Sequence, residues 1–538
     1  MAAATGFRRR RPLLYKYLFL LCFFVMSGVG AQTPSAPQSG GVLKFAVVGE
    51  PTNYDCHAQS SFSFVHAVRP HYSTLLAIDA AKYPALKGDI AASWTVSEDR
   101  LTYTFKLKTG VRFHDGSALT SHDVQASYER IRRPPQGVVS ARAERYADIS
   151  SIDAPDAHTV VFKLSRSNNA MLLNFASPFD CIYSAARLHA DVKFPERNVL
   201  GTGPFVFDTH APGAQWSGKR YAQYHETGKP YLDGYTAQFL PRSRMVDALA
   251  AGEIHAEFRG LAPADRARAV HALGSRAAVH ESPWACAMVV TFNTAKKPFN
   301  TGRVRRALSM AIDRWGGVPA LSKVSMVRQV GGLSRPGSAM SLSEQELTAQ
   351  PGFSKDIEAS RAQARKLLHE VGVAELSFTL INRLSDTLYG PVGDFLVAQW
   401  RQIGVTVRHE QYSPRAFLET LQRENPPFDA ALDFACNYAD EPNLQLARYL
   451  SHDRTATNYG QHFDRTLDNL FDRQSGEPDR RKRYELLRQF ERRALRLAYV
   501  VPVLWWQRAV VMDRNVRGWH VTPSHYIGQD LADVWLAK

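Results

Sequence analysis

The sequence predicts an α/β protein of at least two lobes. The chain has 538 residues, more than the roughly 250–300 residues that a single hydrophobic core supports. Hydrophobic residues make up 45% and charged residues 22%, which is close to the average of soluble globular proteins. Strand-like and helix-like segments alternate along the chain, and we find no repeat of fixed period. These three observations favour packed α/β lobes over disorder, repeats or a coiled coil.

The first 31 residues predict an export signal. Four arginines precede the apolar run LLYKYLFLLCFFVM, and the small residues Val29-Gly30-Ala31 follow it. A basic segment, an apolar segment and a small-residue site are typical of a secretory signal peptide. We expect cleavage near Ala31 and a periplasmic mature protein; an uncleaved membrane anchor is the alternative. Residues 32–41 are rich in Pro, Gly and Ser and predict a linker.

The charge balance excludes a nucleic-acid partner. The formal net charge is +15, and the basic signal segment supplies part of it. The remaining arginines are scattered, and no DNA- or RNA-binding motif accompanies them.

The first half of the mature chain reads mainly as strands. The segment VLKFAVV, from Val42, predicts a buried strand. The alternating segment LTYTFKLKTGVRFHDG predicts a hairpin whose second strand contains Val111 and Phe113. Thr120 and Asp123 form a capping-box pattern at the start of a helix, and SIDAPDAHTVVFKL predicts a second β unit turning at Pro155-Asp156.

The second half contains several amphipathic helices. RVRRALSMAIDR places its apolar residues on one face, so we expect Arg303, Arg305 and Arg306 to be solvated or paired at the surface. EASRAQARKLLHEVGV ends in Gly372, a residue suited to a helix C-cap. A further helix leads through Gly404 into the strand VTVRHEQY, and VVPVLWW predicts a buried strand.

The enzyme motifs that the sequence approaches are incomplete. GAQWSGKR has Arg220 where a phosphate-binding loop needs Ser or Thr, and GTGPFV lacks the third glycine of a dinucleotide site. His225-Glu226 has no second histidine at metalloprotease spacing. We therefore expect a protein that is not an enzyme, with no catalytic residues, no metal and no cofactor.

Four cysteines remain after the signal segment, at positions 56, 181, 286 and 436. No CxxC pair is present, which weakens a redox or zinc role. In an oxidising compartment four separated cysteines favour two disulfides, and three connectivities are possible.

Four stretches carry a resemblance to a known family. They are IAASWTVSEDRLTYTFKLKTGVRFHDGSALTSHDVQASYERI, GTGPF at 201–205, FNTAKKPFNTGRVRRALSMAIDR at 292–314, and the run from NYGQHFDRTLDNLFDR to VVPVLWW. Together they resemble the extracytoplasmic solute-binding proteins of ABC importers, in the family that holds dipeptide-, oligopeptide- and nickel-binding proteins. They extend over nearly the whole mature chain.

The resemblance implies a clamshell like the type II periplasmic binding proteins, with two lobes and an accessory inserted domain. Lobe I would be discontinuous, the insert would follow its first segment, and lobe II would be continuous. The implied bounds are 42–60, 185–280 and 508–538 for lobe I, 61–184 for the accessory domain and 281–507 for lobe II.

The implied function is transport. A monomer would capture a small-molecule solute, peptide-like or otherwise small and polar, between its lobes and deliver it to the membrane permease subunits of an ABC importer. An exported hydrolase or modifying enzyme on the same scaffold is the alternative, and a chaperone-like or sensory partner is a third hypothesis.

The resemblance also implies which residues meet the solute. Three segments would line the cleft, contributing Tyr54, Asp55, His57, Trp284, Tyr438 and Asp440. Oligopeptide-binding members carry a cysteine pair that matches Cys286 with Cys436, which leaves Cys56 for Cys181. They also carry an acid for the peptide's amino group four residues before a proline. Tyr438 stands at that position here, which argues against recognition of a free α-amino group.

Overall fold

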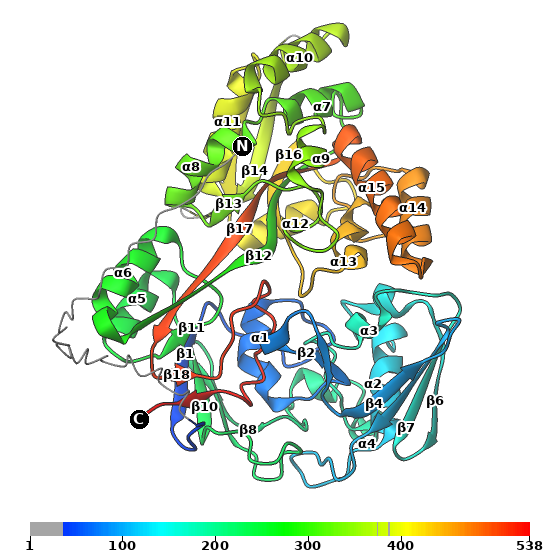
Figure 1. Ribbon diagram of the computed structural model, residues 1–538, viewed down its shortest axis with the longest axis vertical. Helices are drawn as coiled ribbons and strands as arrows, with labels where there is room; N and C mark the ends of the chain where they lie inside the picture. Colours follow the sequence, from blue (N-terminus) through cyan, green and yellow to red (C-terminus); the bar gives the residue numbers. More distant parts are fainter. Residues whose placement is uncertain (1–35, 374, 386–387) are drawn as a thin grey trace, which may run out of the picture. The chain divides into compact units, whose positions relative to one another are not determined.

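Two long antiparallel strands, β12 (Ala277–Phe292) and β17 (Val500–Asp513), dominate the computed structural model, which describes residues 36–373, 375–385 and 388–538. They pair from Ala277 opposite Asp513 to Thr291 opposite Val500, and Figure 1 shows the two strands side by side. The VVPVLWW segment is buried within β17, as predicted.

The two strands form the centre of the main sheet of the described chain. Strands on one side of the pair come from the region 377–436, and those on the other side from the regions 42–47 and 205–257. In spatial order the sheet contains β15 (Thr406–Tyr412), β14 (Ser377–Arg383), β16 (Ala430–Cys436), β12, β17, β11 (Ala256–Glu257), β1 (Val42–Val47), β10 (Gly234–Phe239), β9 (Gln215–Arg220) and β8 (Phe205–Ala211), with β13 (Val327–Gln329) paired to β17.

A separate four-stranded antiparallel sheet lies within the stretch expected as the insert. Its order is β4 (Ala91–Val96), β5 (Thr102–Leu107), β7 (Thr159–Leu164) and β6 (Ile149–Asp156). The β6–β7 hairpin confirms the predicted β unit. Its turn lies at Ala157-His158, because the predicted turn residues Pro155 and Asp156 still belong to β6. Two small sheets complete the strands: β2 (Leu76–Ile78) with β3 (Leu86–Gly88), and β18 (Val516–Arg517) with β19 (Trp535–Leu536).

The predicted hairpin at 101–116 is wrong. β5 pairs with β4 and β7, and the segment after it forms only a single bridge, between Arg112 and Ala118. Val111 and Phe113 are nevertheless buried, in the same hydrophobic cluster as the four-stranded sheet. The alternating pattern therefore reports burial. β5 finds its hydrogen-bond partners in β4, which directly precedes it in the chain, and in the distant strand β7.

Helices cover these sheets. Figure 1 shows α2 over the four-stranded sheet and α14 beside α15. The α-helices are α1 (Phe62–Val68), α2 (Ser121–Arg132), α3 (Met171–Asn174), α4 (Ala185–Ala190), α5 (Arg242–Ala250), α6 (Pro263–Leu273), α7 (Gly302–Met310), α8 (Arg314–Val324), α9 (Glu344–Thr348), α10 (Ile357–Glu370), α11 (Gly390–Arg401), α12 (Pro414–Leu421), α13 (Pro442–Leu446), α14 (Arg465–Gly476) and α15 (Arg480–Leu497).

Local capping chemistry agrees with the sequence. Thr120 and Asp123 form the predicted capping box at the start of α2. Gly372 and Gly404 follow α10 and α11 with φ of +70° and +81°, a conformation that glycine adopts without steric cost.

The prediction that Arg305 lies at the surface is wrong. Its side chain is buried, donating to the backbone carbonyls of Phe299 and Leu497, and its guanidinium lies over the ring of Tyr499. The helical pattern did not anticipate these partners, because two of them lie almost 200 residues away in the sequence.

Three large buried clusters correspond to two lobes and an accessory domain. One surrounds Phe45, Trp216 and Tyr235; a second lies on the four-stranded sheet; a third surrounds Trp400 and Trp506. Two disulfides join distant segments, Cys56 to Cys181 and Cys286 to Cys436.

No helix among the described residues is long and apolar enough to cross a membrane. The predicted signal peptide, residues 1–31, lies outside the described residues.

Candidate functional site

A polar cavity of about 320 Å³ lies where two distant parts of the chain meet. One wall comes from residues 141–174, next to the four-stranded sheet, and the other from residues 436–475, beyond the end of β16. Its volume is at the lower end of the roughly 300–1,000 Å³ typical of small-molecule sites. Its position between separate packed regions is also typical of such sites.

Two short 3₁₀ helices present arginines to this cavity. Arg145 lies in η3 (Ala143–Tyr146) and Arg448 in η6 (Ala447–Tyr449), and both line the cavity. Each arginine is followed by a tyrosine that is buried. The two tyrosines therefore fix the helical turns, and the neighbouring arginines are left half-buried at the cavity wall.

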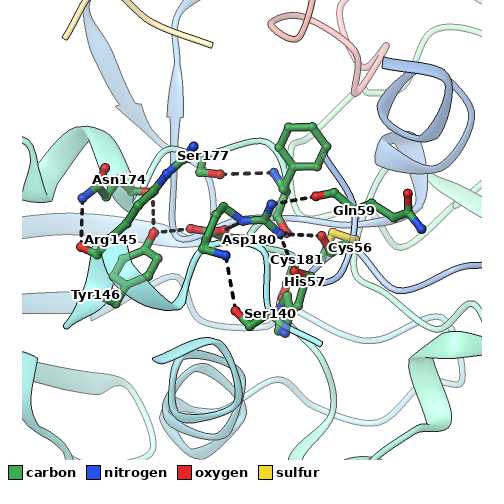
Figure 2. Close-up of polar contacts among 12 residues, drawn as sticks. Cys56, His57, Gln59, Ser140, Arg145, Tyr146, Asn174, Ser177, Asp180 and Cys181 are labelled. Carbon is green, nitrogen blue, oxygen red and sulfur yellow. Dashed lines mark hydrogen bonds and ion pairs between the residues drawn. A yellow bond between two sulfur atoms is a disulfide. The ribbon is translucent and has the colours of Figure 1, made fainter. Parts of the chain in front are cut away.

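Arg142 joins the cavity wall to the interior. Its Nε donates to Asp180 at 3.0 Å, and its terminal nitrogens donate to the carbonyls of Cys56, His57 and Gln59 at 2.6, 3.0 and 2.7 Å. Figure 2 shows Asp180 between Tyr146 and the Cys56–Cys181 disulfide. Burial lowers the pKa of Arg142 and raises that of Asp180, and their ion pair opposes both shifts.

The predicted site residues Asp55 and His57 lie behind this wall. Asp55 pairs with Arg130 at 2.6 Å and accepts a hydrogen bond from Tyr183 at 3.1 Å. Burial raises the pKa of Asp55, but the ion pair with Arg130 and the hydrogen bond from the backbone N–H of His57 lower the pKa overall. Burial lowers the pKa of His57 to about 3, so the ring is neutral. Both residues hold the loop that Arg142 binds, and their contact with a solute stays a prediction.

Tyr54 is placed apart from this network. Its hydroxyl contacts Nδ1 of His210 at 2.8 Å, and its ring packs edge-on against Trp216. Its role in solute binding also stays a prediction.

Trp284 is fully buried. Its indole N–H donates to Nδ1 of His525 at 2.9 Å, and its ring packs against Trp506. The guanidinium of Arg259 lies 5.9 Å from the Trp284 ring and 4.2 Å from that of Phe62. The aromatic predicted to flank a solute therefore belongs to a buried aromatic group with a cation beside it, and its contact with a solute stays a prediction.

The positive charge of Arg259 and that of Arg145 act on a common neighbour. Burial raises the pKa of the Tyr526 hydroxyl, and both guanidinium groups act in the opposite direction. Burial lowers the pKa of Arg259 itself to about 10.

Tyr438 and Asp440 follow β16, and their side chains form hydrogen bonds with other residues of the protein. The Tyr438 hydroxyl donates to Asn174 Oδ1 and to the carbonyl of Leu173, both at 3.3 Å. Asp440 accepts hydrogen bonds from Arg335, the shortest at 2.7 Å, and from the Tyr83 hydroxyl at 3.0 Å. Their expected contact with a solute stays a prediction, whereas the preceding residues Cys436 and Asn437 do line the cavity.

The arginines of the cavity wall could not be identified from the sequence. Arg145 and Arg448 stand in the segments ERYAD and LARYL, which match no binding motif. The one weak local signal is an arginine directly before a tyrosine in both segments. Only the fold brings them to one cavity, since 303 positions separate them in the sequence.

Among the described residues, no group of three or more His, Cys, Asp or Glu side chains could hold a metal ion. The cavity instead presents guanidinium and amide groups. Such groups bind by hydrogen bonding and charge.

Curated relatives align with part of the chain. The glutathione-binding protein GsiB of Escherichia coli O1:K1 / APEC is 30% identical over 339 residues, 62% of this chain and 62% of the relative. GsiB of Salmonella typhimurium LT2 is 30% identical over 342 residues, 63% of each. The chain thus matches less than two thirds of the length of these relatives.

Solved structures share the fold over nearly the whole chain. The periplasmic binding protein AgaA from Agrobacterium tumefaciens R10, in complex with agropinic acid, matches with a TM-score of 0.80 and 24% identity, covering 93% of this chain and 99% of that one. DppA from Helicobacter pylori, in complex with the peptide STSA, matches with a TM-score of 0.79 and 22% identity over 93% and 99%.

The family model described as "Bacterial extracellular solute-binding proteins, family 5 Middle" matches residues 85–455. This match includes the four-stranded sheet, β12, β16 and the two 3₁₀ helices of the cavity wall. The chain belongs to the family 5 bacterial extracellular solute-binding proteins.

Proposed function

We propose that the protein is a periplasmic receptor that captures a small polar, peptide-like solute and delivers it to the membrane permease subunits of an ABC importer. It acts as a monomer, after export and cleavage near Ala31, and carries out no chemistry on the solute. Family membership supports the general role. The glutathione-binding relatives make small peptides the first solutes to test.

The observation that carries the proposal is the cavity between residues 141–174 and 436–475. A solute there would contact both walls at once, so binding would favour the arrangement in which they are close together. A ligand shifts such an equilibrium through its different affinity for the two states, and no reaction is needed. This is the property that a transport receptor requires.

Native mass spectrometry of freshly purified mature protein tests the proposal. We expect one small-molecule adduct per chain, released intact on denaturation, or an increase in melting temperature with glutathione or another small peptide. The absence of an adduct, combined with no melting shift across a broad solute panel, would contradict the receptor function.

The same experiment decides the alternative of an exported hydrolase or modifying enzyme. If a solute is recovered unchanged after prolonged incubation with the protein, turnover is absent. Conversion of that solute, or of a peptide or ester library, into products would replace the receptor proposal with an enzyme.

A further inference from the structure

The lining of the cavity carries an excess of positive charge. Five arginines line it: Arg142, Arg145, Arg166, Arg448 and Arg454. Two carboxylates, Glu144 and Asp148, also line it, so the formal excess is three positive charges.

Three of these arginines are neutralised within the protein. Arg142 pairs with Asp180 at 3.0 Å. Arg166 pairs with Asp148 at 2.6 Å, and Arg454 pairs with Asp472 at 2.9 Å. Their charges support the cavity wall and leave little attraction for a ligand.

Arg145 and Arg448 differ from those three. Within the described part of the chain, no carboxylate forms an ion pair with either guanidinium. Arg145 lies over the Tyr438 ring, and Arg448 reaches only the carbonyl of Phe434 at 3.4 Å. A half-buried guanidinium without a counter-ion has lost part of its hydration and gained no charged partner.

The two unpaired guanidinium groups come from opposite walls. Arg145 belongs to the region 141–174 and Arg448 to the region 436–475. A carboxylate offers each guanidinium two oxygens in matching geometry, so it is the group that such a pair selects. An anionic solute bound to both would hold the two walls together.

We propose, resting on the receptor function above, that the captured solute is an organic anion whose carboxylate groups bind Arg145 and Arg448. The expected solutes of the cavity are therefore acidic peptides and other metabolites that carry carboxylates. Neutral sugars and polyamines are not expected to bind.

Matched pairs of solutes test the charge requirement by isothermal titration calorimetry. The acids are glutathione, citrate, trialanine and N-succinylalanine, each compared with its methyl ester; maltose and spermidine are the neutral and cationic probes. We expect binding among the acids and a loss of about 10- to 100-fold on esterification, as for a hydrogen-bonded charge. Maltose, spermidine or an ester binding as tightly as the acids would overturn the anion proposal and leave the receptor function standing.

Variants identify the residues. Arg145→Gln and Arg448→Gln should each weaken binding of the acid about 10- to 100-fold, whereas Arg145→Lys, which keeps the charge, should restore part of the affinity. Arg415→Gln is the control, because the Arg415 side chain is 90% exposed on α12, away from the cavity lining, and pairs with Glu419. Melting curves of the free variants show whether they are folded. Unchanged affinity in folded Arg145→Gln and Arg448→Gln would overturn the assignment.

If none of the solutes tested by calorimetry binds, native mass spectrometry decides whether the solute is an anion. If native mass spectrometry still finds an adduct, an elemental composition with an acidic group supports the proposal, and one without it overturns the proposal. If no adduct is found either, the receptor function falls as well.

Discussion

The guanidinium carbon of Arg145 lies 5.4 Å from the ring centroid of Tyr438. Tyr438 follows β16 of the main sheet, yet it is buried in the cluster on the four-stranded sheet. Tyr438 thus links the main sheet to the cluster on the four-stranded sheet, and its ring contacts the guanidinium of Arg145. The resemblance places a carboxylate at this position in oligopeptide binders, whereas this chain has a neutral side chain with a guanidinium over its ring.

Arg142 is predicted to be essential for stability. Arg142→Met removes the ion pair with Asp180 and three bonds to loop carbonyls, leaving a buried carboxylate without a counter-ion. We expect a loss of about 3–5 kcal/mol in the free energy of unfolding, measured in urea.

A second substitution separates the effect of the unpaired Asp180 carboxylate from the other effects of losing Arg142. Asp180→Asn in the Arg142→Met background removes the unpaired carboxylate and should recover part of the loss, because the two side chains are coupled. A single-variant effect below about 1 kcal/mol would show that the ion pair is dispensable.

The Cys286–Cys436 disulfide is predicted to stabilise the main sheet. The cysteines face each other on paired strands β12 and β16 and are separated by 150 residues. Replacing both with alanine should lower the free energy of unfolding by about 3–5 kcal/mol, since the link closes a long loop. Non-reducing peptide mapping should recover this pair and the Cys56–Cys181 pair. Free thiols at positions 286 and 436 would contradict the assignment.

Glu491 predicts a pH dependence of stability. Burial raises the pKa of this carboxyl to about 7, well above its ordinary value of 4.5. The folded state therefore keeps its proton to a higher pH than the unfolded state. As pH rises from about 4.5 to 7, this group lowers the free energy of unfolding, by up to about 3 kcal/mol.

The measurement compares wild type with Glu491→Gln in urea at pH 5 and pH 8. Glutamine does not titrate, so the variant should gain about 2–3 kcal/mol relative to wild type between the two pH values. The Leu333 N–H donates a hydrogen bond of 2.6 Å to Glu491. If glutamine keeps this bond, it contributes equally to the free energy of unfolding at both pH values. A pH-independent difference would show that Glu491 does not titrate in this range.

Solute binding should raise stability by mass action. At a free solute concentration of about 100 times Kd, the free energy of unfolding should rise by about 2.7 kcal/mol. At the same concentration the gain should be smaller for Arg448→Gln, because its Kd is weaker. An equal gain in both proteins would place the binding site elsewhere.

Local patterns in the sequence were enough for much of the fold. The burial of β1 and β17, the capping box of α2 and the glycines after α10 and α11 depend on neighbouring residues, and all were predicted. The hairpin at 101–116 and the exposure of Arg305 were wrong, because the partners that decide them come from distant segments.

The candidate site follows the same rule. Cys436 could be placed through the resemblance, and its neighbour Asn437 lines the cavity as well. Arg145 and Arg448 could not be found, since an arginine without a carboxylate partner is recognised only when its surroundings are known. Asp55 and His57, which the resemblance placed at the cleft, belong to the buried network that supports Arg142.

A crystal structure of the protein with its co-purified solute tests the central claim most directly. The account predicts one solute in the cavity between residues 141–174 and 436–475, with carboxylate oxygens within hydrogen-bonding distance of the Arg145 and Arg448 guanidinium groups. A solute bound at another place, or one that presents no anionic group to these arginines, would contradict it.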